Sequence, residues 1–232
     1  ADPRFVKGTI VLDEISMEEA MELSYFGAKV IHPSTMMPLL ERGISLRIKN
    51  TLNPSVKGTL IRQNPTPHQN DITGIASISA AALINIEGSG MIGIPGFASR
   101  VFGALARVKV NVIMISQASS EHSICIVCRE VEAQTALAAL RAELAVEHKQ
   151  KKLKDCELVT GLEIIAVIGE NMRGRPGITG RLFSSLGNAN VNVLAIAQGS
   201  SERNISFVIQ SKDREKALNT VHAAFIGAGV KK

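Results

Sequence analysis

The sequence predicts an α+β protein in which two tandem ferredoxin-like βαββαβ modules follow an α/β segment. The first observation behind this prediction is an internal repeat. Residues 88–127 match residues 169–208 at a shift of about 81 positions, with roughly 18 identities in 40 positions. A shared composition does not produce a match of this length in register. The second observation is that both copies show the same order of strand and helix patterns.

Each copy begins with a short apolar run that is typical of a buried strand, at 82–87 and at 163–168. A loop rich in Gly and Pro follows it and ends in Pro95-Gly96 or Pro176-Gly177. The next segment predicts an amphipathic helix, because its apolar residues recur on one face. These residues are Phe97, Val101, Phe102 and Leu105 in the first copy, and Ile178, Leu182, Phe183 and Leu186 in the second.

The remainder of each copy predicts two strands and a second helix. The V-N-V-x-x-I stretch reads as a strand, and a polar S-S-E turn leads to another strand at 123–127 or 204–209. Helices are predicted at 131–146 and 213–225, and a final strand at 157–160 is possible for the first copy. The order β-α-β-β-α is that of an antiparallel sheet covered on one face by two helices.

The segment before the repeat has a different pattern. Residues 15–40 predict a helix in two pieces, broken near Gly27 and by Pro33. Strands are predicted at 44–49 and 58–62. We therefore expect an N-terminal part at 1–62, a linker at 63–73, one module at 74–160 and a second at 161–226.

Composition narrows the class of function. The chain has 232 residues, a net charge of +5, 45% apolar and 20% charged residues, which is the balance of a globular protein. The basic residues are scattered, and the dense run at 148–154 reads as a solvated linker, so we expect no nucleic-acid partner. No apolar run is long enough to span a membrane, so we expect no membrane partner and a cytoplasmic location.

The sequence shows no metal site and no catalytic set. Cys125 and Cys128 resemble a C-x-x-C motif, but they lie in a strand pattern and no Cys or His pair with zinc spacing follows. We interpret them, with Cys156, as reduced core cysteines. We find no Ser/His/Asp set or carboxylate pair at credible spacing.

The loops that open the first helices suit the binding of a small zwitterion. Residues 93–97 and 174–178 place free backbone N–H groups at a helix N-terminus, where a carboxylate is favoured. The following strands bring Asn111 and Gln117, or Asn192 and Gln198, toward the same end of the sheet. Their amides donate and accept hydrogen bonds without adding charge.

These residues resemble the paired ACT domains of aspartate kinases, especially of the bifunctional aspartokinase–homoserine dehydrogenase type. The phrases SQASSEHS and AQGSSERNIS are similar to the two effector loops of that group. The segments ADPR, DEIS and FGAKVIHP, in residues 1–33, resemble the last part of the kinase domain. The resemblance covers essentially the whole chain.

The resemblance implies that the chain is a fragment of the kinase. The K-F-G-G-[TS] segment of the family is absent, so we expect the fragment by itself to be inactive, with no cofactor of its own. ATP and Mg belong to the full-length kinase. The GAG sequence at 227–229 is followed by no helix pattern and does not support a dinucleotide fingerprint. A dehydrogenase domain is possible in a longer protein.

The resemblance also implies a set of effector-binding residues. Gln117 and Gln198 come first, followed by Asn111 and Asn192. The residues expected to supply backbone and wall contacts are Ile94, Gly96, Phe97, Val112, Arg175, Gly177, Ile178 and Val193. Arg4 and Lys29 match family positions that contact nucleotide phosphates. The Q-x-S-S-E pattern resembles the threonine-sensitive class, so threonine is the expected effector and lysine is the alternative.

Other interpretations remain open at this point. The repeated asparagines could serve turns alone, and the S-S-E residues (Ser119, Ser120, Glu121 and Ser200, Ser201, Glu202) could stabilise the turn and the module interface. The modules could be a ligand-free dimerisation scaffold, because open sheet edges favour side-by-side pairing. We expect a homo-oligomer in either case. A kinase that works with Arg4 and Lys29 alone lacks a phosphate loop and a base.

Overall fold

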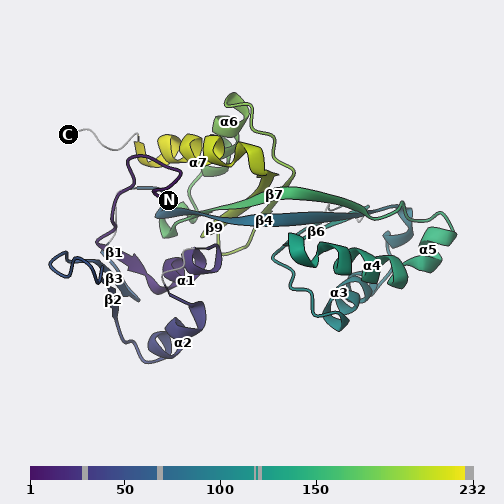
Figure 1. Cartoon of the computed structure of the whole chain (residues 1–232), viewed down its shortest axis with the longest axis horizontal. Helices are drawn as coiled ribbons and strands as arrows, with labels where there is room; N and C mark the ends of the chain where they lie inside the picture. Colours follow the sequence, from purple (N-terminus) through teal and green to yellow (C-terminus); the bar gives the residue numbers. More distant parts are fainter. Residues whose placement is uncertain (28–30, 67–69, 118, 120–121, 228–232) are drawn as a thin grey trace. The chain divides into compact units, whose positions relative to one another are not determined.

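The computed structural model describes residues 1–27, 31–66, 70–117, 119 and 122–227 (Figure 1). The chain forms two compact units. The first unit contains residues 1–78, 165–193 and 198–232, and the second contains residues 79–164 and 194–197. The chain therefore begins in the first unit, forms most of the second at 79–164, returns at 165, and enters the second unit again at 194–197.

The N-terminal part of the first unit is a small α/β layer. Strand β1 (Glu14–Ser16) pairs in parallel with β3 (Thr59–Arg62), which pairs antiparallel with β2 (Leu46–Ile48). Helices α1 (Met17–Tyr25) and α2 (Pro33–Glu41) share one buried core with this sheet. Helix α1 starts with a capping box, in which Ser16 and Glu19 satisfy each other's backbone N–H groups. The buried core of this layer comprises Ile15, Met17, Ala20, Met36 and Ile61.

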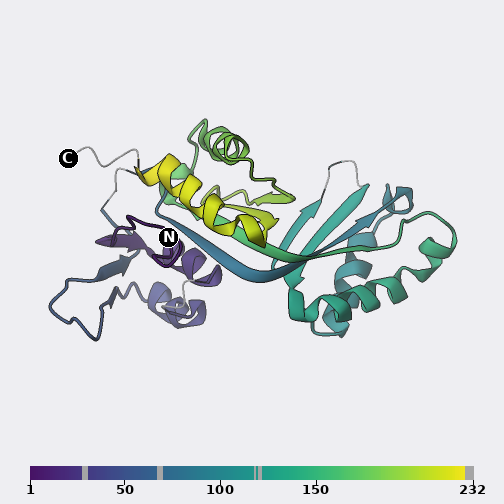
Figure 2. The same cartoon turned by 45° about the horizontal axis from the view of Figure 1, so that its top comes forward.

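The second unit holds the first repeat. Strand β6 (Ser123–Arg129) lies between β4 (Gly74–Glu87) and β5 (Met114–Gln117), and both pairings are antiparallel. Helices α3 (Phe97–Arg107) and α4 (Ala133–Glu143) cover one face of these strands, and the short helix α5 (Ala145–Lys149) follows (Figures 1 and 2). The buried side chains that join helices to strands include Ile84, Ile86, Val101, Leu105, Ile124, Ile126, Leu137 and Leu140.

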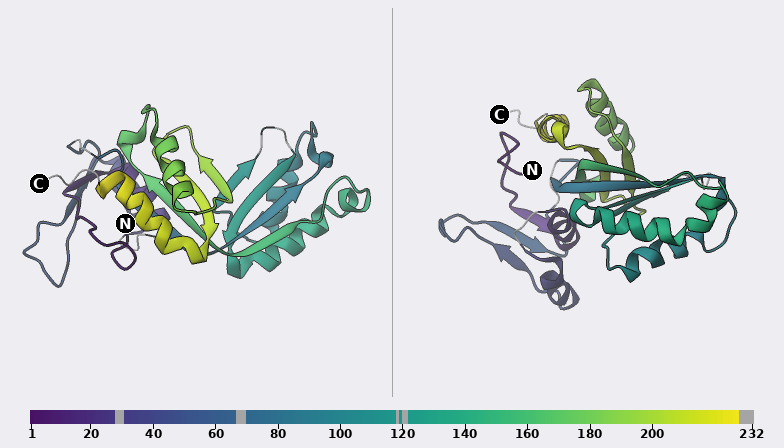
Figure 3. Two further views of the ribbon diagram at one scale, coloured as in Figure 1. Left: turned by 90° about the horizontal axis from the view of Figure 1, so that it is seen from above. Right: turned by 45° about the vertical axis from the view of Figure 1, so that its right-hand side comes forward.

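The second repeat builds the same layers, and its residues 165–193 and 198–227 belong to the first unit. Strands β7 (Glu157–Ile168) and β9 (Asn204–Gln210) are neighbours, and α6 (Ile178–Asn188) and α7 (Arg214–His222) lie on the same side of them (Figure 3). Strand β8 (Ala195–Gln198) connects α6 to β9. The buried core of this repeat includes Ile165, Val167, Leu182, Leu186, Ile205, Phe207, Leu218 and Val221.

Two residues, one just before β4 and one at its start, complete the core of the second repeat. Ile72 and Ile75 are buried in the same cluster as Phe207, whereas Leu153 and Cys156 fill the cluster of the first repeat. The two pairs are related by the 81-residue shift of the repeat. The second module is therefore discontinuous in sequence, because the first is inserted between its parts.

The structure confirms the β-α-β-β-α order in both copies and corrects several limits. Strand β4 begins at Gly74 instead of residue 82, and β1 was not predicted. The strands predicted at 157–160 and 163–168 are one strand, β7. Gly161 lies inside it with φ +69°, a backbone conformation that favours glycine. The helix predicted at 131–146 divides into α4 and α5, and α7 ends at His222 in a π-helical turn at Ala223–Gly227.

The predicted limits of the modules and linker stay a prediction. In the described residues, no helix combines the length and the apolarity that crossing a membrane requires.

Candidate ligand-binding site

The helix-entry loop of the second repeat ends at an uncapped helix N-terminus. Gly177 is the N-cap of α6 and has φ +89°, a left-handed conformation that favours glycine. No side chain among the described residues forms a capping hydrogen bond there. The first N–H groups of α6 are thus available to an anion, which the helix dipole also favours.

A pocket of about 300 Å³ lies against this loop. Its wall consists of residues from the loop, the first residues of α6, the end of β8, the turn before β9 and β9 itself: Met172, Gly174, Arg175, Pro176, Gly177, Ile178, Thr179, Gln198, Glu202 and Ile205. Four predicted residues, Gln198, Arg175, Gly177 and Ile178, therefore lie together. The volume is at the lower end of the range for small-molecule sites, which suits a ligand of a few heavy atoms.

Glu202 is a pocket residue that the sequence assigned to the turn and the module interface and not to the ligand. It has φ +55°, and its carboxylate accepts a hydrogen bond from the backbone N–H of Gly174. This bond ties the turn before β9 to the helix-entry loop. The repeated S-S-E pattern marked the position, but only the folded loop shows that its carboxylate lines the pocket.

Two arginines at this loop share one carboxylate. Arg175 lines the pocket and Arg181 lies in the first turns of α6, and both form ion pairs with Asp71. The guanidinium of Arg181 also lies 4.1 Å from the centroid of the Phe225 ring. Asp71 belongs to the segment that precedes the first repeat, so sequence spacing gave no sign of this contact.

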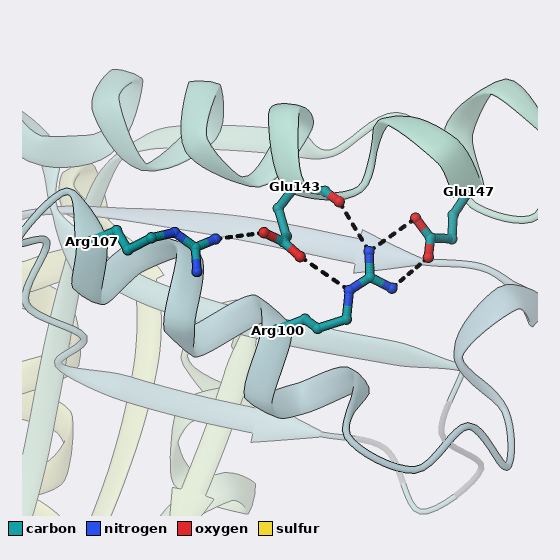
Figure 4. A network of polar contacts seen from close by, with 4 residues as sticks. All are labelled: Arg100, Arg107, Glu143 and Glu147. Atoms are coloured by element: carbon teal, nitrogen blue, oxygen red, sulfur yellow. Dashed lines mark hydrogen bonds and ion pairs between the residues drawn. The ribbon is translucent and has the colours of Figure 1, made fainter.

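In the first repeat, the residue that corresponds to Arg181 is Arg100, and it has different ion-pair partners. Arg100 of α3 donates hydrogen bonds to the carboxylates of Glu143 and Glu147, and Arg107 pairs with Glu143 (Figure 4). These hydrogen bonds raise the pKa of Arg100 and lower the pKa of both carboxyl groups. All four residues belong to the second unit, so α3 is tied to the other helices of its own module.

Gln117 lies in a different environment from Gln198. It lines a pocket of about 450 Å³ formed by the second unit. The other residues of this pocket are Leu83, Asn85, Ser116, Ser123, Cys125, Glu157, Val159, Leu194 and Ala195. None of the predicted loop residues Ile94, Gly96 or Phe97 lines it. Asn85 was missed because it stands in an apolar run that reads as a buried strand.

The remaining predicted residues are distributed as follows. Gly96 is the N-cap of α3 with φ +83°, Phe97 is buried, and Ile94 is 49% exposed. Asn111 and Asn192 are exposed, and Val112 and Val193 pack against the cores of their modules. Neither asparagine is among the residues that line the two pockets.

The two residues predicted to bind nucleotide phosphates are not both described. Arg4 is exposed and pairs with Asp2, and it borders a separate pocket of about 380 Å³ in the first unit. Lys29 lies outside the described residues, as do Ser120 and Glu121.

The described residues contain no group of three His, Cys, Asp or Glu side chains that could hold a metal ion. Cys125, Cys128 and Cys156 are free, and burial raises the pKa of the first two to about 11.

The family model of the ACT domain matches residues 84–144 and 165–225, which is more than half of the chain. The chain belongs to the ACT domain family. The two matched segments are the two repeats, so the duplicated fold and the family assignment rest on the same residues.

Curated relatives of this ACT domain chain are larger enzymes. It is 44% identical over 230 residues to bifunctional aspartokinase/homoserine dehydrogenase 2 of Arabidopsis thaliana, a match that covers 97% of this chain and 25% of the relative. The bifunctional aspartokinase/homoserine dehydrogenase of Haemophilus influenzae is 44% identical over 223 residues, covering 96% and 27%. The chain thus spans about a quarter of the length of these relatives.

Solved structures of aspartate kinases have the same fold. The aspartate kinase of Clostridium acetobutylicum superposes with a TM-score of 0.85 at 30% identity, covering 97% of this chain and 51% of that one. Aspartokinase III of E. coli, in complex with lysine and aspartate, superposes with a TM-score of 0.78 at 27% identity, covering 97% and 48%.

Proposed function

We propose that this chain is the regulatory part of an aspartate kinase and that the pocket beside Gln198 binds free threonine as a feedback effector. One observation carries the proposal most strongly: an amide, an uncapped helix N-terminus and an arginine converge on one small pocket. The similarity to aspartokinases over 97% of the chain supports the assignment to this kind of enzyme.

The chemistry of the pocket suits an α-amino acid with a polar side chain. The ligand carboxylate is expected at the first N–H groups of α6, with Arg175 nearby. The amide of Gln198 offers both a donor and an acceptor, which a β-hydroxyl group can use together. Glu202 lines the same pocket and supplies an acceptor for the ammonium group.

Lysine is the second candidate, and Glu202 is the observation that favours it. A carboxylate in the wall can pair with the ammonium at the end of a lysine side chain. The E. coli aspartokinase III structure that this chain resembles is a complex with lysine and aspartate. Gln198 favours threonine, because its amide offers the donor and the acceptor that a β-hydroxyl group can use together, whereas the side chain of lysine ends in donors only.

Isothermal titration calorimetry with threonine and with lysine tests the proposal. We expect saturable heat with threonine, and weakening of about tenfold or more in a Gln198→Ala variant, which loses a hydrogen bond to a charged or polar ligand. The matched control is Gln134→Ala, an exposed glutamine of α4. Heat from lysine alone, abolished by Glu202→Gln, would replace threonine by lysine. No heat from either amino acid would overturn the proposed function.

Binding by the first module is a separate part of the proposal. A Gln117→Ala variant is expected to weaken threonine binding less than Gln198→Ala, because Gln117 does not share a pocket with its helix-entry loop. Equal loss in both variants would contradict this difference between the modules.

We also propose that the chain forms a homo-oligomer through its ACT domains. Exposed apolar residues on the short strands β5 and β8 support this, because Ile115 and Ile196 are 44% and 43% exposed. Sedimentation velocity at several concentrations tests it, and a monomer throughout would contradict it.

A further inference from the structure

One buried carboxylate connects three segments of the first unit. Glu19 of α1 is 1% exposed, and its Oε2 accepts the backbone N–H of Ser16 at 3.0 Å. Its Oε1 accepts the backbone N–H of Glu170 at 2.8 Å and the hydroxyl of Thr73. The first contact closes the capping box, and the other two reach the second ACT domain and the start of β4.

A second carboxylate on the same helix face makes a parallel contact. Glu22, three residues further along α1, accepts a hydrogen bond from the side-chain amide of Asn204 at 2.8 Å. Glu170 lies two residues before Met172, the first residue that lines the ligand pocket, and Asn204 lies two residues after Glu202. Helix α1 is therefore hydrogen-bonded to two chain segments that also contain pocket-lining residues.

The two contacts are also joined to each other. The carboxylate of Glu170 accepts hydrogen bonds from the guanidinium of Arg203, the neighbour of Glu202 in sequence. Glu202 in turn holds the N–H of Gly174 in the helix-entry loop. A rearrangement of this loop around a ligand thus acts on Glu170 and, through its N–H, on Glu19.

We propose that Glu19 is a positioning residue that couples ligand occupancy of the second ACT pocket to helix α1. This inference rests on the proposed function of that pocket. The physical reason is burial, because a buried carboxylate that loses its donors is costly, so α1 follows the loop rather than separating from it. The first module has Ser89 at the position of Glu170 and His122 at the position of Arg203, so its sequence lacks both members of this ion pair.

The chain contains a natural reporter for this coupling. Tyr25 is the only tyrosine, the chain has no tryptophan, and Tyr25 is the last residue of α1. The whole chain labelled with 3-fluorotyrosine gives one fluorine NMR signal, which reports on α1 alone. We expect threonine to shift this signal with the same midpoint as the calorimetric heat.

The test variant is Glu19→Gln, because an amide has one acceptor oxygen where the carboxylate has two. We expect threonine to bind with saturable heat, and the shift of the Tyr25 signal to fall to less than half of that in the unmodified chain. Glu41→Gln, which removes the same charge from the exposed end of α2, is the control and should leave the shift unchanged. Thr73→Val removes only the hydroxyl donor, so we expect a shift of the Tyr25 signal between those of the unmodified chain and Glu19→Gln. This variant takes the place of Glu19→Gln if Glu19→Gln fails to fold.

Different failures separate the inference from the proposed function. Saturable calorimetric heat from threonine with no shift of the Tyr25 fluorine signal would overturn the coupling and leave the proposed effector site intact. A second measurement needs no ligand: hydrogen exchange of the Gly174 amide should accelerate about tenfold in Glu19→Gln, which corresponds to the loss of about one hydrogen bond. Faster exchange in α1 alone would overturn the coupling, even if no amino acid bound.

Discussion

The two glycines at the start of α6 differ in what an added methyl group would do. Gly177 is the N-cap with φ +89°, and Gly180 lies three residues into the helix. A Cβ added at either position would meet no atom within 4 Å. Space is therefore not the difference between them. The difference is backbone conformation, since L-residues are disfavoured in the left-handed region that Gly177 occupies.

We predict that Gly177→Ala and Gly180→Ala change stability in opposite directions. The left-handed conformation costs a residue with a Cβ roughly 1–2 kcal/mol, so Gly177→Ala should destabilise the chain by about that amount. Gly180→Ala should stabilise it by about 0.5–1 kcal/mol, because glycine is a poor helix residue. Gly177→Asn should recover much of the loss, since asparagine tolerates this region better.

Urea unfolding followed by circular dichroism measures these differences, with the slope compared between variants to check that the transition is unchanged. Gly177→Ala is also expected to weaken threonine binding, because relief of the strain moves the N–H groups that receive the carboxylate. An unfolding midpoint for Gly177→Ala at or above that of the unmodified chain would refute the argument. So would a loss of stability in Gly180→Ala.

Three further outcomes follow from buried groups. Phe207 is fully buried with its ring 5.9 Å from that of Phe183, so Phe207→Ala should destabilise its module by about 3–5 kcal/mol in urea unfolding. Burial lowers the pKa of His222, and the charge of the N-terminal amino group lowers it further. Below about pH 6.5 the unfolded chain therefore gains a proton that the folded chain binds only at lower pH. The free energy of unfolding should fall as the pH drops through this range. Urea midpoints between pH 7.5 and pH 5 should fall less steeply in His222→Gln, and an unchanged slope would contradict this. The pKa of Cys128 is raised to about 11, so iodoacetamide should label it far more slowly in the native than in the unfolded chain by mass spectrometry.

The repeat explains why so much of the fold could be predicted from the sequence. Two copies of one pattern, 81 residues apart, show the same apolar faces and the same Pro-Gly loops, and each copy supports the interpretation of the other. The helix-entry glycines, Gly96 and Gly177, lie where the pattern placed them, because the left-handed N-cap is a local requirement. Gln198 lines one pocket with its helix-entry loop, as the pattern predicted, whereas Gln117 and the equivalent loop of the first repeat do not, so spacing alone did not decide this part of the site.

The tertiary structure alone decided how the modules are completed and what joins them. Ile72, just before β4, and Ile75, at its start, enter the core of the second module, and no local pattern encodes this long-range choice. Asp71 meets Arg175 across 104 residues of sequence, and Glu19 meets Glu170 across 151. The sequence by itself determined the local elements and the duplicated fold, because apolar periodicity and turn chemistry act over a few residues. Contacts between distant carboxylates and the loops they hold depend on packing, and only the folded chain brings them together.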